Sequence, residues 1–204
     1  MPTSIWTRLA LIGLTLVFLS ACATVVVGSI AATGLAVQDR RSVGTVIDDN
    51  VLELRVGDAL YGDPAFDTSS RIRIVAYNGW ILLAGEALDQ RRVELATELV
   101  RNVDGVVRLF NELEPQAKAT LGQRNSDRWL STRVNSGLTG IDLPDFNATR
   151  VKVMTTRGVV YLMGLVSRDE AEAAVERTRV VRGVQRVVSI FQYLDELPEP
   201  EIIE

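Results

Sequence analysis

The sequence lacks histidine altogether and contains a single cysteine, Cys22, among its 204 residues. Without histidine, the commonest general base and the commonest metal ligand are both missing. One cysteine cannot form a disulfide within the chain, and it cannot hold a metal ion alone. We therefore expect no metal, no cofactor and a fold that is stabilised by packing without cross-links.

Carboxylates are the remaining candidates for acid–base chemistry, and their positions do not favour it. Asp49 is expected to cap a helix next to Asp48, whereas Asp142 and Asp145 flank Pro144 in a composition typical of turns. General acid–base catalysis needs two groups that flank one cleft and have separated pKa values. The sequence also has no HExxH motif and no phosphate-binding glycine loop with a lysine. We predict that the protein is not an enzyme.

The N-terminus has the layout of a bacterial secretory signal. Arg8 precedes an apolar run of eleven residues, 9–19, and two small residues then precede Cys22. The pattern resembles a lipobox, which is cut before a cysteine that receives acyl chains such as palmitate. Two or more acyl chains hold a protein stably on a bilayer, whereas one anchors it only marginally. Cleavage would remove residues 1–21 as a signal peptide.

Two other interpretations of Cys22 stay open at this point. A lone cysteine in an apolar stretch is often a small buried hydrophobic residue. Because no charged residue occurs between Arg8 and Asp39, the stretch would also suit an uncleaved transmembrane helix. Residues 23–37 argue against that helix, since they contain two glycines and three consecutive valines. The lipoprotein interpretation is therefore favoured.

The chain repeats itself. Four residues recur in the same order at a spacing of 78, as Asp49, Leu52, Arg55 and Val56, then Asp127, Leu130, Arg133 and Val134. Gly79 and Gly85 recur as Gly158 and Gly164 at a spacing of 79, and Gly105 recurs as Gly183 at 78. Matches that keep their order over such a length indicate two copies of one module.

Each copy has the same expected order of helix, strand, strand, helix and strand. The first helices are expected at 49–60 and 127–138, and the second at 89–102 and 167–180. Asn78-Gly79 and Arg157-Gly158 mark the turns of the hairpins. The fold class is therefore α+β, with two tandem modules, each a small three-stranded mixed sheet packed on two helices.

The expected boundaries follow from these elements. They are a signal peptide (1–21), an acylated spacer (22–47), a first module (48–114), a linker (115–124), a second module (125–194) and an acidic tail (195–204).

The glycine-punctuated hairpin, the helix after it and the Gly105-Val106 and Gly183-Val184 starts of the last strands resemble the BON domain family. Together with the lipobox and Asp39-Arg40-Arg41-Ser42, the two copies are similar to the dual-BON outer-membrane lipoproteins, which are associated with cell division and envelope stress. This resemblance implies periplasmic residence, no known catalysis, anionic phospholipid binding through the second module and support of outer-membrane integrity. Because Ala23 rather than aspartate follows Cys22, it also implies sorting to the outer membrane.

The two copies differ in charge. Residues 48–114 contain seven arginines and thirteen acidic residues, a net charge of −6, whereas residues 124–194 contain ten arginines, one lysine and seven acidic residues, a net charge of +4. A basic module is drawn to an anionic membrane, since each nearby cationic side chain contributes roughly 1 kcal/mol. The net charge of the whole chain, −4, argues against binding nucleic acid.

The first helix of the second module carries the predicted phospholipid site. Successive residues on a helix are 100° apart, which places the candidates on one face or at its edge: Trp129, Thr132, Arg133, Ser136, Arg128 and Asn135. Tryptophan suits the headgroup level of a bilayer, and arginine forks onto phosphate. The alternatives are that Trp129 fills the core, and that Arg133, which matches Arg55, pairs with a carboxylate.

A different class of function competes with lipid binding. On this alternative the acidic first module, or an exposed sheet, docks an envelope protein, and lipid contact comes only from the acyl chains on Cys22. A structural or osmotic-stress role without a discrete ligand also stays open.

Overall fold

The computed structural model describes residues 39–66 and 69–196, which belong to one compact unit, residues 39–204. Cys22 and the predicted signal peptide lie outside the described residues, so the lipobox and the transmembrane alternative stay predictions. Among the helices that are described, none combines the length and the apolar character that crossing a bilayer requires.

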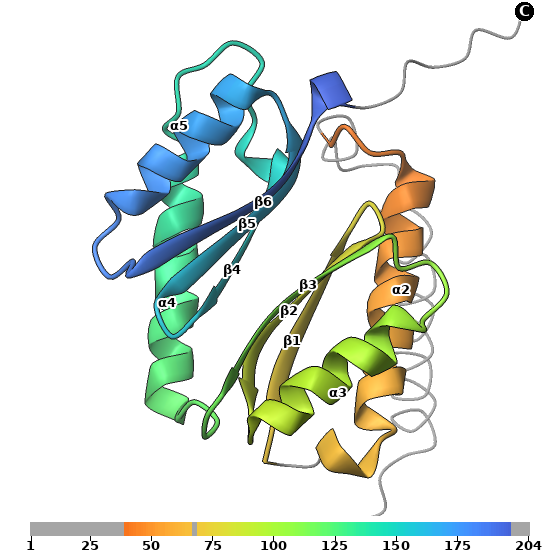
Figure 1. The fold of residues 1–204 in the computed structure, drawn as a ribbon. Coiled ribbons are helices and arrows are strands. Elements are labelled where there is room, and N and C mark those ends of the chain that lie inside the picture. Colours follow the sequence, from red (N-terminus) through yellow and green to blue (C-terminus); the bar gives the residue numbers. More distant parts are fainter. Residues whose placement is uncertain (1–38, 67–68, 197–204) are drawn as a thin grey trace, which may run out of the picture. The chain divides into compact units, whose positions relative to one another are not determined.

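The first module has the predicted element order, with one short 3-10 turn added (Figure 1). Its elements are α2 (Val43–Tyr61), η1 (Pro64–Phe66), β1 (Arg71–Tyr77), β2 (Trp80–Ala87), α3 (Gln90–Arg101) and β3 (Arg108–Pro115). The sheet order is β1-β2-β3, with β1 antiparallel to β2 and β2 parallel to β3. This is the mixed sheet that the sequence predicts.

The second module repeats this order and pairing. Its elements are α4 (Leu121–Leu138), η2 (Ala148–Arg150), β4 (Val151–Thr156), β5 (Val159–Val166), α5 (Arg168–Arg179), β6 (Arg186–Tyr193) and η3 (Leu194–Glu196). β5 is antiparallel to β4 and parallel to β6. Asp89 and Ser167 cap α3 and α5 as predicted, since each side chain accepts a backbone N–H from the first turn.

The two long helices begin about one and a half turns earlier than expected. Ser42 caps α2, and Thr120 caps α4 through a capping box with Gln123. α2 therefore includes the last five residues of the predicted spacer, and α4 includes the last four of the predicted linker. The prediction that Asp49 caps a helix is wrong, because Asp49 lies inside α2.

Asp49 and Asp127 instead hold the hairpin turns. The carboxylate of Asp127 accepts the backbone N–H groups of Arg157 at 3.0 Å and Gly158 at 3.1 Å. Asp49 accepts those of Asn78 and Gly79 in the same way. Both residues of each turn have positive φ, as tight hairpin turns of this type require. In each module, the recurring aspartate thus links the first helix to the hairpin turn through hydrogen bonds.

The sheets of the two modules face each other, and the helices lie on the outer sides (Figure 1). One cluster of buried residues joins the facing surfaces: Tyr77, Leu82, Ala84, Met154, Tyr161, Met163, Leu165 and Ile190. Separate cores lie between each sheet and its own helices. Hydrogen bonds reinforce the contact, since Leu165 N donates to the Tyr77 hydroxyl at 3.0 Å and Lys152 Nζ donates to the Ala76 carbonyl at 2.9 Å.

The segment before α2 fastens the two modules together. Arg40 forms a bidentate pair with Glu170 of α5, at 2.5 and 2.9 Å, and also donates to the Leu165 carbonyl. Arg41 pairs with Asp49 at 2.6 Å. Its side chain is only 6% exposed. Both arginines are therefore engaged within the protein, and Arg41 is not free to contact lipid.

Replacing Asp127 with alanine is expected to lower the free energy of unfolding by about 2–4 kcal/mol, because two turn N–H groups lose a charged acceptor. Asp142→Ala, at an exposed position, is the control and is expected to change it by less than about 0.5 kcal/mol. Urea denaturation measures the free energy of unfolding of both variants. Similar values for Asp127→Ala and Asp142→Ala would contradict a stabilising role of the Asp127 hydrogen bonds.

Glu170→Gln is expected to make the protein less sensitive to acid. Burial raises the pKa of Glu170, but the hydrogen bonds from Arg40 and Ser167 outweigh it and lower the pKa below the ordinary 4.5. Stability from a depressed carboxyl pKa is present above the ordinary value and is lost as the pH falls through the lower, folded-state value. The unfolding free energy of the wild type should therefore fall more steeply than that of Glu170→Gln from about pH 5 to about pH 3.

The matched control is Glu172→Gln, which replaces an exposed carboxylate on the same helix. It is expected to keep the acid dependence of the wild type. Parallel pH profiles for the wild type and Glu170→Gln would show that the Arg40 pair contributes nothing to stability.

Candidate functional site

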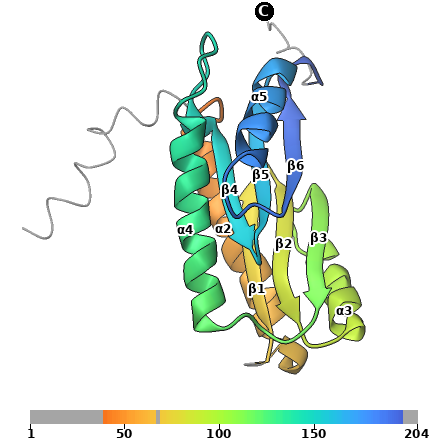
Figure 2. The ribbon, with the colours of Figure 1, turned by 90° about the vertical axis from the view of Figure 1, so that its left-hand side faces the viewer.

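α4 presents one face to the core and the other to solvent. Its buried stripe, Leu130, Val134 and Leu138, packs on the sheet of the second module. Figure 2, which looks onto the helix side of this module, shows α4 running along its outside. Because three buried residues fix the rotation of the helix, the residues between them are presented outward.

All six predicted site residues lie on the exposed part of α4: Arg128, Trp129, Thr132, Arg133, Asn135 and Ser136. The Trp129 side chain is 69% exposed, so the alternative that it fills the core is wrong. Large exposed aromatic residues at a surface otherwise rich in charge are typical of binding sites. The structure contains no lipid, and the binding role of these residues stays a prediction.

Arg133 stands free on this face. Within residues 39–66 and 69–196 it has no ion pair and no side-chain hydrogen bond, contrary to the possibility that it pairs with a carboxylate. One guanidinium nitrogen lies against Gly183, where an added Cβ would be 3.3 Å away. The glycine thus leaves room for the arginine beside the turn between α5 and β6.

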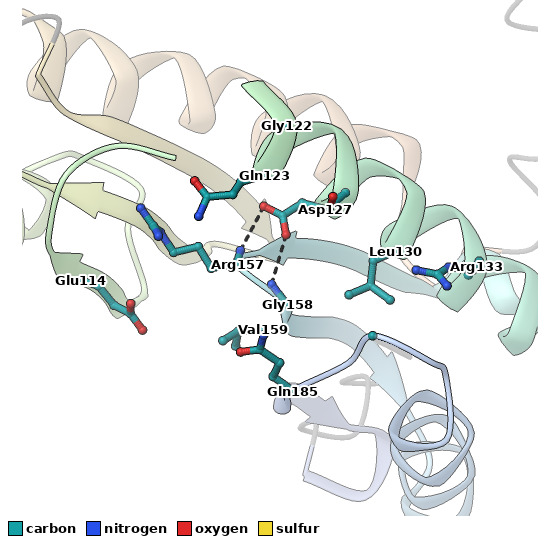
Figure 3. A pocket seen from close by; sticks show the side chains of 12 residues that line it. Glu114, Gly122, Gln123, Asp127, Leu130, Arg133, Arg157, Gly158, Val159 and Gln185 are labelled. Carbon is teal, nitrogen blue, oxygen red and sulfur yellow. Dashed lines mark hydrogen bonds between the residues drawn. The ribbon is translucent and has the colours of Figure 1, made fainter. Parts of the chain in front are cut away.

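A hollow of about 710 Å³ opens beside Arg133, between the first half of α4 and two turns (Figure 3). Polar side chains line much of it, among them Gln123, Gln185 and Arg157. Arg157 is already engaged, since it donates to Glu86 at 3.0 Å and to the Ala117 carbonyl at 2.6 Å. Arg133 is therefore the cation at this hollow that is free to meet an anion.

The corresponding hollow of the first module, about 410 Å³, is more acidic. Asp48 and Asp104 line it, and at a spacing of 78 their counterparts in the second module are Ser126 and Arg182. Equivalent positions on one scaffold thus change from acidic to neutral or basic. Of the side chains that line each hollow, three carboxylates and one arginine belong to the first, and two carboxylates and two arginines belong to the second. An anion is therefore repelled less from the second hollow than from the first.

The sequence does not predict this hollow. The recurring Gly158 and Gly183 predict the two turns, but no sequence pattern indicates that both turns meet the first half of α4. No sequence pattern identifies Gln185 as a residue that lines the hollow. Within the described residues, no three carboxylates gather closely enough to hold a metal ion.

Trp129→Ala is expected to change the free energy of unfolding by less than about 0.5 kcal/mol, because the indole is largely exposed. Leu130→Ala, one position along the same helix, is expected to cost about 2–5 kcal/mol because its side chain is only 3% exposed. Urea denaturation distinguishes the two variants. An equal loss in both would mean that Trp129 packs within the fold.

Comparison with known proteins identifies the module. The BON domain matches residues 48–116 and 126–195. The chain is 36% identical to the outer membrane lipoprotein DolP of Haemophilus influenzae over 88% of its own length and 92% of that protein. It is 40% identical to a 21 kDa hemolysin of Actinobacillus pleuropneumoniae over 76% of its own length and 79% of that protein.

Among solved structures, CdsD, a structural protein of the type III secretion system of Chlamydia trachomatis, aligns with a TM-score of 0.29 and 12% identity, over 71% of this chain and 92% of that one. The two domain matches together cover more than half of the chain. The two α-β-β-α-β modules with their mixed sheets are therefore BON domains, and the chain belongs to the BON domain family.

Proposed function

We propose that this protein is a periplasm-facing outer-membrane lipoprotein that binds anionic phospholipid through its second BON domain. One observation carries the proposal: an exposed indole, Trp129, stands on α4 beside Arg128 and Arg133, and neither arginine has an ion pair within the described residues. On this proposal α4 lies along the bilayer surface. The protein supports outer-membrane integrity through the contact of α4 with phospholipids of that membrane.

The chemistry of this face suits the headgroup region. An indole has an apolar ring and one polar N–H, so it is stable where hydrocarbon meets water. A guanidinium that has no carboxylate partner gives up no ion pair when it forks onto a phosphate. Thr132 and Ser136 add two hydroxyl groups to the same exposed face.

The anchor and the location follow from separate observations. Cys22 ends a sequence that resembles a lipobox, and acylation there would attach the chain to a membrane. A relative that matches most of the chain is named an outer membrane lipoprotein. Together they favour an acylated protein at the outer membrane.

The charge difference between the domains favours the second one for lipid contact. A net charge of +4 over residues 124–194 attracts this domain to anionic lipid, whereas −6 over residues 48–114 opposes approach of the first. Binding of this kind weakens as salt screens the charges.

Trp129→Glu is expected to weaken binding to vesicles that contain phosphatidylglycerol by about ten-fold or more. The change removes the indole and places a negative charge at the surface, and one charge alone contributes about 1 kcal/mol there. Flotation of the non-acylated compact unit, residues 39–204, with anionic and with zwitterionic vesicles measures this.

The chain offers a matched control for that variant. Val51 is the counterpart of Trp129 in the first domain and is also exposed, so Val51→Glu introduces the same charge at the equivalent position. It is expected to bind nearly as the wild type does. Equal loss in the two variants, with both folded, would remove Trp129 from the site.

A second candidate function rests on α2 of the first domain. This helix exposes an apolar stripe at helical spacing, which includes Ile47 at 56% exposure and Leu54 at 69%. The surrounding domain is acidic, so a complementary partner would present an apolar strip flanked by basic side chains. On this alternative the protein is an adaptor for an envelope protein, and only its acyl chains contact lipid.

The flotation experiment separates the two candidates. Binding of the non-acylated protein to anionic vesicles alone, with loss at high salt, favours phospholipid recognition. No flotation with either lipid would overturn that proposal and leave the adaptor.

A further inference from the structure

A hollow of about 280 Å³ lies between the two sheets that face each other. The residues that line it come from α2, β1 and β2 of the first domain and from β4 and β5 of the second. Because α4 contributes none of these lining residues, the hollow is separate from the surface that we propose for bilayer contact.

The floor of this hollow is apolar and well covered by protein. Four side chains form most of it, Leu82, Tyr161, Met163 and Met154, and at most 4% of each residue is exposed. Val75 extends the floor from the first domain. Hydrocarbon that lies against these side chains is removed from water, which favours binding of an apolar group.

Both methionines of the compact unit, residues 39–204, belong to this floor. The whole chain has three methionines, and the third is Met1. At a spacing of 79, the counterparts of Met154 and Met163 in the first domain are Val75 and Ala84. Methionine is unbranched and flexible, so it fits its shape to an apolar neighbour more readily than valine does. The second domain thus supplies an adaptable wall.

The rim of the hollow carries charged side chains at equivalent positions of the two domains. Arg73 and Lys152 both line it and are 79 residues apart, which is the spacing of the hairpin repeat. Nζ of Lys152 pairs with Glu53 at 3.6 Å and donates to the Ala76 carbonyl at 2.9 Å. Arg73 is exposed, and within the described residues it has neither an ion pair nor a side-chain hydrogen bond.

The charged residues that line the hollow leave it with one excess positive charge. Glu53 keeps its negative charge although it pairs with Lys152, so the two cations and one carboxylate give a net charge of +1. The guanidinium of Arg73 can present two N–H groups to one carboxylate or phosphate group. An anionic group at Arg73 therefore meets a donor that gives up no partner.

The size of the hollow suits one hydrocarbon chain. Its volume of about 280 Å³ lies at the lower end of the range for small-molecule sites, roughly 300–1,000 Å³. A diacyl phospholipid would bring two long chains to this space. A single short chain with an anionic head matches both the volume of the hollow and the separation of its apolar floor from its charged rim.

We infer that the hollow binds a single-chain anionic amphiphile, namely a fatty acid of medium length. Its hydrocarbon chain lies between the two sheets, and its carboxylate pairs with Arg73. This site goes beyond the proposed function of α4, because α4 contacts the surface of a bilayer whereas the hollow takes up one molecule. The site needs both domains, since each contributes part of the floor and part of the rim.

Decanoate, added below its micelle concentration to the compact unit, is the probe. The methyl signals of protein labelled with [¹³C-methyl]methionine report on the hollow, because both methionines of the compact unit line it. Both signals are expected to shift and to reach saturation with decanoate. Sodium chloride at equal ionic strength is expected to leave them unchanged. Unshifted signals at saturating decanoate would overturn the inference.

The length of the probe tests the apolar floor. From hexanoate to decanoate, affinity is expected to rise by up to about four-fold for each methylene that becomes buried. Affinity that does not depend on chain length would mean that the hydrocarbon stays in water, which contradicts insertion between the sheets.

Arg73→Gln tests the rim, and Arg91→Gln is its matched control. Both variants remove one positive charge from an exposed arginine of the first domain, but Arg91 lies on α3 and does not line the hollow. Arg73→Gln is expected to weaken decanoate binding about five-fold, because exposed ion pairs contribute modestly. It is expected to leave the binding of the uncharged decanol unchanged. Equal decanoate affinities of the two variants would overturn the pairing with Arg73.

The outcomes separate this site from the one on α4. Trp129→Glu is expected to keep decanoate binding. If decanoate leaves the methionine signals unchanged while the wild type floats with phosphatidylglycerol vesicles, this inference fails and the proposed function stands. If decanoate binds and vesicles do not, the reverse holds. If monomeric short-chain phosphatidylglycerol displaces decanoate from the hollow, the site takes phospholipid, and the assignment to a single-chain ligand is overturned.

Discussion

The contact between the two sheets is the constraint on which the surface of this protein depends. Leu82 of one sheet and Tyr161 and Met163 of the other are buried in a cluster that joins the domains. A BON domain covers one face of its sheet with its own helices, so the second face would otherwise be exposed to water. Burying both second faces against each other places every helix on the outside. α4 therefore has a free outer face.

Buried carboxylates determine which arginines stay available. Asp127 is used by the hairpin turn, and Glu86 is used by Arg157 and Arg71. Arg40 and Arg41 are likewise held by acids of both domains. Arg128 and Arg133, which lie beside Trp129, have no carboxylate partner within the described residues and therefore stay available. Net charge distinguishes the two domains as surfaces for an anion, but it does not indicate which side chains would meet one.

The sequence predicts the fold well where local rules act. The repeat spacing, the Asn-Gly and Arg-Gly turns and the caps Asp89 and Ser167 are short-range signals, and the elements follow them closely. The predicted helix starts differ from the structure for a physical reason. Aspartate suits a helix cap, but Asp49 and Asp127 serve turns some 30 residues away, and Ser42 and Thr120 are the caps. A residue type that satisfies two structural roles does not reveal which one it has.

By itself, the sequence determined the duplicated α-β-β-α-β order, the inward stripe of α4 and the composition of its outer face, because helical periodicity and turn chemistry act over a few residues. Only the tertiary structure decided that Trp129 is exposed, that Arg133 is unpaired within the described residues, and that Tyr77 of one domain packs against the sheet of the other. These facts depend on contacts between residues that are distant in the chain. Packing of the two sheets brings those residues together, and no local pattern records that packing.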